Sequence, residues 1–292
     1  MRGIVIKSTG SWYKVRLENG DHIDARVRGK LRVSGIKATN PVAVGDFVEL
    51  SHTNDDWNID SIHERKNYIV RKATKLSSQT HVVAANLDIA LVVATINFPN
   101  IKLGFIDRLL ATTEAYDIHS VLIFNKTDLL TKDEMNYLDE LIEAYKKVGY
   151  NSLKISVTNG EGIDEVKNLI EGKTAVISGH SGVGKSSLLN ALNPAFNARI
   201  TDVSESNEKG RHTTTFAELF EVNDHTFVID TPGLKSFGLT MMEAEELKDY
   251  FPEMVKLSQD CKFYNCIHRN EPGCAVRKAF ETGQLPWFRY ET

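Results

Sequence analysis

Residues 179–186 read Gly179-His180-Ser181-Gly182-Val183-Gly184-Lys185-Ser186. They fit the pattern GxxxxGK[ST], in which glycines let successive backbone N–H groups turn toward phosphate oxygens. The apolar run Thr174–Ser178 before them predicts a buried strand, and Ser187–Leu192 after them predicts a helix. This strand–loop–helix context favours a phosphate-binding loop over a simple glycine-rich turn.

Strands and helices alternate around this loop. Apolar runs predict buried strands over Leu87–Ile96, Ser120–Phe124, Leu153–Val157 and Thr226–Ile229. Helical spacing predicts helices over Phe105–Tyr116, Lys132–Val148 and Ile163–Glu171. The alternation predicts a doubly wound α/β sheet with its ligand site at the carboxyl ends of the strands.

A second motif follows one of these strands and reads Asn125-Lys126-Thr127-Asp128. Guanine presents an N1–H and a 2-amino group that can both donate to Asp128, whereas adenine would leave the carboxylate unpaired, at a cost of about 1–3 kcal/mol or more. Asn125 can bind the base and tie loops together, and the Lys126 stem can lie over the purine plane. Ser156 and Val157, at a later strand end, can support the base through backbone N–H groups. GTP and GDP are therefore the expected ligands.

The phosphate side of the expected site comprises Gly179, His180, Ser181, Gly182, Val183, Gly184, Lys185, Ser186 and Ser187. Lys185 is expected at the β- and γ-phosphates and Ser186 at Mg²⁺. A third motif reads Asp230-Thr231-Pro232-Gly233, and it places Asp230 in the magnesium shell and the Gly233 N–H near the γ-phosphate. Thr213 and Thr214 are the candidates for the last magnesium ligand, and Thr214 is assigned to it.

The residue after the third motif bears on catalysis. Leu234 stands where many GTPases carry a glutamine that orients water, so the sequence predicts slow intrinsic hydrolysis. His212 or a group supplied by a partner would then position the water, although a lone histidine is more often structural. The expected catalytic residues are His212, Thr213, Thr214 and Lys185.

The motifs occur in a circularly permuted order. Ordinary small GTPases begin with the phosphate loop, whereas here the base motif comes first. Such a permutation preserves the sheet when the old chain ends are joined. The third motif then leads directly into the C-terminal region, so ordering by the γ-phosphate would act on the next domain.

The N-terminal residues predict a small β-barrel, with the OB-fold as the leading candidate. Candidate strands are Gly3–Lys7, Trp12–Glu18, His22–Arg28, Asp46–Ser51 and Asn58–His63. Residues 1–76 carry 14 Lys and Arg against 9 Asp and Glu, a net charge of +5. Because the whole chain has a net charge of −4, the remaining residues carry a net charge of −9. This asymmetry and the basic loop 29–37 suggest a polyanionic partner, although an ordinary solvated surface explains them as well.

All three cysteines lie within 14 residues near the C-terminus, as Cys261-x4-Cys266-x-His268-x5-Cys274. Three thiolates and one imidazole make a closed tetrahedral site, which predicts one structural Zn²⁺. A helix is expected over Ala275–Thr282. The aromatic residues that follow it, Trp287, Phe288 and Tyr290, can dock RNA beside Arg277 and Lys278, but packing on their own domain is favoured.

The whole constellation resembles the RsgA (YjeQ) family of bacterial ribosome-assembly GTPases. The resemblance covers essentially the entire chain and implies a GTPase that acts late in maturation of the small ribosomal subunit, with ribosome-stimulated hydrolysis, rRNA contacts and zinc at the four Cys and His positions. The expected domains are an OB-fold RNA-binding domain (1–65), a linker (66–80), a permuted GTPase domain (81–237) and a helical zinc-binding domain (238–292).

Two other function classes compete with this one. A signalling or trafficking GTPase is disfavoured by the absence of a lipidation motif in Arg289-Tyr290-Glu291-Thr292. A non-enzymatic RNA-binding protein with a nucleotide-sensing site is kept open by Leu234, and multiple-turnover phosphate release would exclude it. With 41% hydrophobic residues and no apolar run long enough to span a bilayer, a cytoplasmic protein with no membrane partner is expected. Nothing in the sequence demands an oligomer, so a monomer is expected.

Overall fold

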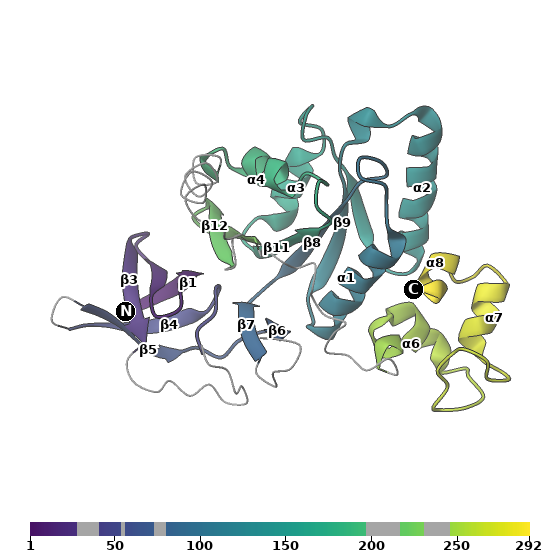
Figure 1. Ribbon diagram of the computed structural model, residues 1–292, viewed down its shortest axis with the longest axis horizontal. Helices are drawn as coiled ribbons and strands as arrows, with labels where there is room; N and C mark the ends of the chain where they lie inside the picture. The colour runs from purple at the N-terminus through teal and green to yellow at the C-terminus, as the bar shows by residue number, and fades with distance from the viewer. Residues whose placement is uncertain (28–40, 54–55, 73–79, 197–216, 231–245) are drawn as a thin grey trace.

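The computed structural model describes residues 1–27, 41–53, 56–72, 80–196, 217–230 and 246–292. Three parts follow one another along the chain: an N-terminal barrel, a central α/β domain and a C-terminal helical region (Figure 1). The predicted multidomain architecture is confirmed.

The barrel is built from five short strands that bury apolar side chains in a shared core. They are β1 (Arg2–Ser8), β2 (Tyr13–Leu17), β3 (His22–Val27), β4 (Phe47–Thr53) and β5 (Asp56–Ile62). The strand order is β1-β2-β3-β5-β4, and β4 pairs back onto β1, which closes the barrel. Its core includes Val5, Val15 and Ile59, none of which is exposed to solvent. The predicted five-stranded barrel is confirmed.

The barrel and the central domain share one sheet, which the sequence patterns did not predict. Strand β12 (Glu218–Asn223) pairs with β1, with Lys7 opposite Glu218, and thereby joins the barrel to the central strands in an 11-stranded sheet. The stretch 66–80, whose composition indicates a linker, contains strand β6 (Tyr68–Lys72), which pairs with β7 (Thr80–Ala85). This connection is therefore partly a hairpin.

The central sheet follows the predicted parallel pattern. Its strands run in the order β10-β9-β8-β11-β13, with bounds β8 (Ile89–Ala94), β9 (His119–Phe124), β10 (Asn151–Lys154), β11 (Thr174–Gly179) and β13 (Thr226–Asp230). Alternate side chains of β8 and β9 enter two different cores. One core contains α1 (Leu103–Ala115) and α2 (Lys132–Lys147), and the other contains α3 (Ile163–Ile170) and α4 (Lys185–Leu192). Helices therefore cover both faces of the sheet, as predicted for a doubly wound fold.

The C-terminal region comprises η4 (Leu247–Tyr250), α6 (Pro252–Ser258), α7 (Ala275–Glu281) and α8 (Trp287–Glu291). It packs against α1 and α2 and shares their core. Phe288 is buried in that core and Tyr290 stacks on Phe280 with ring centroids 4.5 Å apart, whereas Trp287 is exposed. Two of the three aromatic residues therefore pack within the protein.

Among the residues that the structure describes, none of the helices has the length and apolar character needed to cross a membrane.

Candidate functional site: two loops at one sheet edge

The phosphate loop and the base motif lie side by side because their strands are close neighbours in the sheet. The loop follows β11 and the base motif follows β9, and β8 pairs with both of these strands. The Asn125 amide Nδ2 donates to the Val183 carbonyl at 2.9 Å, which ties the two loops together as predicted. Gly184 has a φ of +96°, and a Cβ there would overlap Asn125 Nδ2, so this approach requires glycine.

Lys126 is held across the same two loops. Its Nζ donates to the Gly182 carbonyl at 2.8 Å and to the Phe98 carbonyl at 2.6 Å. The backbone of Lys126 is left-handed, with φ 65°. These bonds fix the aliphatic stem between its ends, which suits a flat surface for a purine ring.

Asp128 is exposed and is oriented by a serine hydroxyl. Ser156 Oγ donates to Asp128 Oδ1 at 2.6 Å, while the Ser156 N–H is used by the Glu161 carbonyl at 3.0 Å. Ser156 lies beyond the end of β10. Its side chain contacts the base motif, and its backbone N–H, which was expected to support the base, is bonded within its own loop. The Val157 N–H donates to Asn125 Oδ1 at 3.3 Å.

Thr127 of the base motif is buried and anchors the loop. Its hydroxyl donates to the Ile155 carbonyl at 3.0 Å, and its backbone N–H reaches the same oxygen at 3.3 Å. The short helix η1 (Thr127–Leu129) starts here. The Thr127 side chain therefore supports the shape of the motif, and Asp128 is left facing outward.

The N-terminus of α4 lies at the end of the phosphate loop, where its unpaired N–H groups suit an anion. The Lys185 ammonium folds back on the loop and donates to the carbonyls of Gly179 at 2.9 Å and His180 at 2.8 Å. Ser186 and Ser187 in the first turn are exposed. The partly buried His180 ring lies edge-on to Phe105, with centroids 5.8 Å apart.

Asp230 borders the site on the side of β11 away from β8. It is the last residue of β13 and lies opposite Ile177 in the parallel pairing, so β13 ends at the same sheet edge as the phosphate loop. A serine hydroxyl and a carboxylate are oxygen donors of the kind Mg²⁺ prefers, so Ser186 and Asp230 fit that ion. His212, Thr213, Thr214, Gly233 and Leu234 lie outside the described residues.

The β8–α1 connection contributes groups that sequence reasoning missed. Phe98 provides a backbone carbonyl to Lys126, and Thr95 Oγ1 donates to the Pro99 carbonyl at 2.7 Å. Asn97 contacts Glu134, which also completes the capping box of α2 with Thr131. Backbone acceptors leave no residue-type signal, so no sequence motif could have identified them.

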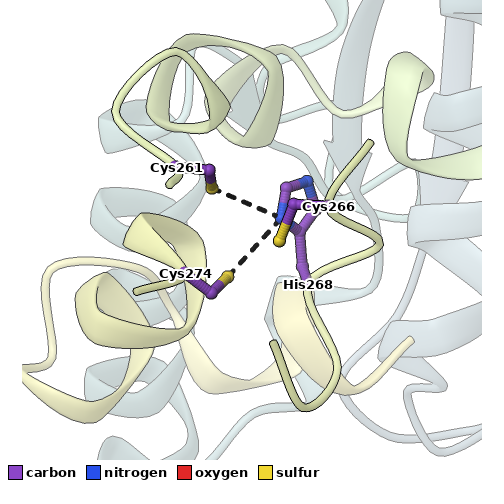
Figure 2. Close-up of side chains that lie close together, drawn as sticks. All are labelled: Cys261, Cys266, His268 and Cys274. Atoms are coloured by element: carbon purple, nitrogen blue, oxygen red, sulfur yellow. Dashed lines mark hydrogen bonds between the residues drawn. The ribbon is translucent and has the colours of Figure 1, made fainter. Parts of the chain in front are cut away.

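The four predicted zinc ligands come together in the C-terminal region (Figure 2). Ligand atoms of Cys261, Cys266, His268 and Cys274 all lie within 4.8 Å of one another. The Sγ atoms of Cys274 and Cys261 lie 3.5 and 3.8 Å from His268 Nδ1. Ligands about 2.0–2.3 Å from a tetrahedral zinc ion would lie about 3.5–3.8 Å apart, so these two distances and the three-thiolate, one-imidazole donor set fit this metal.

The protonation state of the histidine also suits a metal. Burial, and then the nearby charge of Lys248, lowers the pKa of His268 and favours the neutral imidazole that ligates metals. Glu271 accepts from the backbone N–H groups of Ile267, Arg269 and Asn270 at 2.8, 2.9 and 3.0 Å. These bonds hold the loop in the shape that carries His268.

Fold and loop arrangement together define a circularly permuted P-loop GTPase. The family models "RsgA GTPase" and "RsgA N-terminal domain" match residues 62–240 and 2–58. The chain belongs to the RsgA GTPase family and is a GTP hydrolase.

Curated relatives carry the name small ribosomal subunit biogenesis GTPase RsgA. The protein of Bacteroides fragilis (strain YCH46) is 48% identical over 291 residues, which cover 99% of this chain and 94% of that protein. The protein of Flavobacterium johnsoniae is 48% identical over 299 residues, covering 100% of this chain and 91% of that protein.

Solved structures agree with the fold along nearly the whole chain. The crystal structure of YjeQ from Thermotoga maritima superposes with a TM-score of 0.80 at 34% identity, covering 99% of this chain and 94% of that one. The crystal structure of YloQ, described as a circularly permuted GTPase, gives 0.74 at 32% identity, covering 99% and 91%.

Proposed function

We propose that this protein binds the small ribosomal subunit through its rRNA and assists late maturation of that subunit, with GTP hydrolysis stimulated by the ribosome. One structural observation carries the proposal: hydrogen bonds from Asn125 and Lys126 join the base motif to the phosphate loop. The chain that contains this site is closely similar to small-subunit biogenesis GTPases. The net charge of +5 on residues 1–76, in a chain whose barrel continues the nucleotide-binding sheet, supports a polyanionic partner.

Phosphates are bound by residues 179–187. Lys185 exchanges its two carbonyl acceptors for the more strongly accepting β- and γ-phosphate oxygens, because a charged acceptor makes the stronger bond. Ser186, Asp230 and Thr214 would hold Mg²⁺, which would neutralise phosphate charge. The Gly233 N–H contacts the γ-phosphate.

Guanine is bound by the base motif. Asp128, oriented by the Ser156 hydroxyl, accepts from N1–H and the 2-amino group. Lys126 covers one face of the purine, and Asn125 and Val157 close the pocket. Leu234 stands at the usual glutamine position but has no polar group to orient water, so His212 is assigned this role. One Zn²⁺ at Cys261, Cys266, His268 and Cys274 holds the C-terminal domain together, and the protein acts as a cytoplasmic monomer.

The guanine assignment has a direct test. Asp128→Asn replaces one acceptor by an N–H donor, which suits the 2-oxo group of xanthine better than the 2-amino group of guanine. We expect GDP affinity to fall at least about 100-fold and XDP affinity to rise, measured by fluorescent-nucleotide competition. Equal affinity of the variant for GDP would contradict the role of Asp128.

The partner is tested by phosphate release from GTP under multiple turnover. The protein is assayed alone and with isolated small subunits, large subunits or free RNA. We expect strong stimulation by small subunits alone, and Asp128→Asn should show that stimulation with XTP rather than GTP. Stimulation by large subunits or free RNA to the same extent would contradict the proposed partner. The variant His212→Ala should lose GTP hydrolysis and keep GTP binding, which separates the two functions.

A further inference from the structure

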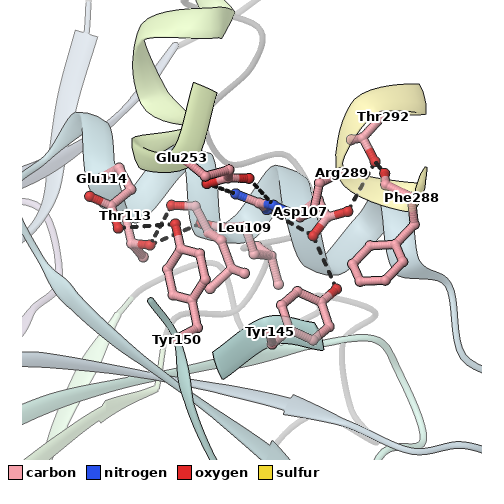
Figure 3. Close-up of polar contacts among 11 residues, drawn as sticks. Asp107, Leu109, Thr113, Glu114, Tyr145, Tyr150, Glu253, Phe288, Arg289 and Thr292 are labelled. Carbon is pink, nitrogen blue, oxygen red and sulfur yellow. Dashed lines mark hydrogen bonds and ion pairs between the residues drawn. The ribbon is translucent and has the colours of Figure 1, made fainter. Parts of the chain in front are cut away.

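A buried arginine joins the C-terminal domain to the helical layer of the GTPase domain (Figure 3). The Arg289 side chain on α8 has no solvent exposure. Its Nη1 donates to Asp107 Oδ1 on α1 at 2.9 Å, and its Nε donates to Glu253 Oε1 on α6 at 2.6 Å. One guanidinium thus fixes α8 and α6 against α1.

Asp107 is the centre of this contact. Besides Arg289 it accepts from Tyr145 on α2 and from Thr292, each at 3.0 Å. Burial raises the pKa of Asp107 by more than Arg289 lowers it, so the ionised carboxylate depends on all of these donors. The ring of Phe251 packs under the guanidinium, with 4.3 Å from Arg289 Cζ to the ring centroid.

The helix that carries Asp107 begins at the nucleotide site. Phe105, two residues earlier on α1, contacts the His180 ring of the phosphate loop. The connection that leads into α1 contributes the Phe98 carbonyl to Lys126. A displacement of α1 therefore moves groups that touch both nucleotide-binding loops.

The helix that carries Arg289 also contacts the metal cluster. Tyr290, the next residue, donates its hydroxyl to the backbone carbonyl of His268 at 2.6 Å. Its ring stacks on Phe280 of α7, which follows directly after Cys274. Adjacent residues of α8 therefore face the metal ligands on one side and α1 on the other.

We propose that α8 couples the zinc cluster to the guanine-nucleotide site, with Arg289 as the positioning residue that sets α1. Nucleotide affinity then depends on an intact cluster, and by thermodynamic linkage bound nucleotide stabilises the cluster. The coupling rests on the nucleotide site and is independent of the ribosomal partner.

The first test measures the affinity of the full-length protein for fluorescent GDP before and after zinc removal by a chelator. We expect chelation to weaken binding about five- to tenfold in the wild type. Asp107→Asn and Arg289→Lys should show weakened binding with zinc present and less than about a twofold further change on chelation. Unchanged wild-type affinity after chelation, or an equal further loss in both variants, would overturn the proposal.

The second test measures the reciprocal effect without enzyme activity. Zinc transfer to a chromogenic chelator is followed with and without GDP. We expect GDP to slow transfer about five- to tenfold in the wild type and to have little effect in Arg289→Lys. Tyr290→Phe, which loses one hydroxyl, should also lose the GDP effect, and an undiminished effect in both variants would contradict coupling through α8.

A matched control is available on the neighbouring helix. Arg277 forms an ion pair with Glu281 at 3.3 Å on the partly exposed face of α7. Arg277→Gln removes a positive charge from the same domain but should leave both coupling measurements at wild-type values. A loss as large as that in Arg289→Lys would show that general destabilisation, rather than positioning by Arg289, explains the effect.

Discussion

The GTPase domain is joined to its two neighbours in different ways. On the barrel side the backbone contributes directly to the join: β1 pairs with β12, and the Ala85 N–H donates to Val44 O at 2.9 Å. Apolar side chains of β1, Ile4 and Ile6, also share a core with the central strands. On the C-terminal side, buried side chains dominate, with Arg289 between Asp107 and Glu253.

This difference predicts where each junction is sensitive to mutation. Backbone hydrogen bonds persist when side chains are exchanged, so the barrel junction should tolerate most substitutions of its exposed side chains. A buried ion pair that loses one partner leaves an uncompensated charge in a medium of low dielectric constant. The C-terminal junction should therefore depend strongly on individual residues.

The largest expected effect is at Arg289. Arg289→Met leaves Asp107 and Glu253 without their cation and should lower the free energy of unfolding by about 3–5 kcal/mol. Urea denaturation measures the loss, and hydrogen exchange should place it in α6 and α8. A loss below about 1 kcal/mol would mean that the cluster contributes little to docking.

The next effect tests whether backbone geometry controls the barrel junction. Gly45 has a φ of +89°, and a Cβ there would overlap the Ala85 carbonyl. Gly45→Ala should cost about 2–3 kcal/mol in urea denaturation. Gly10 has a φ of +90°, and a Cβ built there would have no atom within 4 Å. Gly10→Ala is therefore the matched control for the cost of the left-handed backbone without a steric overlap. Equal losses would show that the contact with Ala85 is unimportant.

A smaller effect is expected at Tyr145, which shares the acceptor Asp107 with Arg289. Tyr145→Phe removes the hydroxyl that donates to Asp107 at 3.0 Å and keeps the buried ring. Because the acceptor is ionised, the loss of stability should be about 1.5–3 kcal/mol, at the lower end because Arg289 and Thr292 remain. The denaturation midpoint should fall without a change in slope, and an unaltered midpoint would argue against an ionised Asp107.

The smallest effect is expected at the seam between β1 and β12. The Lys7–Glu218 ion pair spans 3.1 Å, and 35% of the Lys7 side chain is exposed. Lys7→Met should change stability by less than about 1 kcal/mol, and by less again at high salt. A loss comparable to that of Arg289→Met would refute the distinction between the two junctions.

Sequence alone determined the chemistry of the site. Three local patterns carried this information: the residue types at 125–128 and 179–186, the spacing of the three cysteines with His268, and the alternation of strands and helices. They are local because loop geometry, ligand type and strand burial each require particular residues within a short segment. These patterns were enough to predict the family and the permuted order of its motifs. The barrel was also predictable, since its strands are short and closely spaced.

Only the tertiary structure decided how the parts are joined. Arg289 is an ordinary basic residue in the sequence, and its burial follows from a partner 182 residues away. The seam between β1 and β12 joins residues 211 apart, and the acceptors of Lys126 are backbone carbonyls that any residue possesses. Local patterns report which structure a segment prefers. Such contacts instead arise from packing between distant segments, and the type of a residue does not indicate which distant residue it will contact.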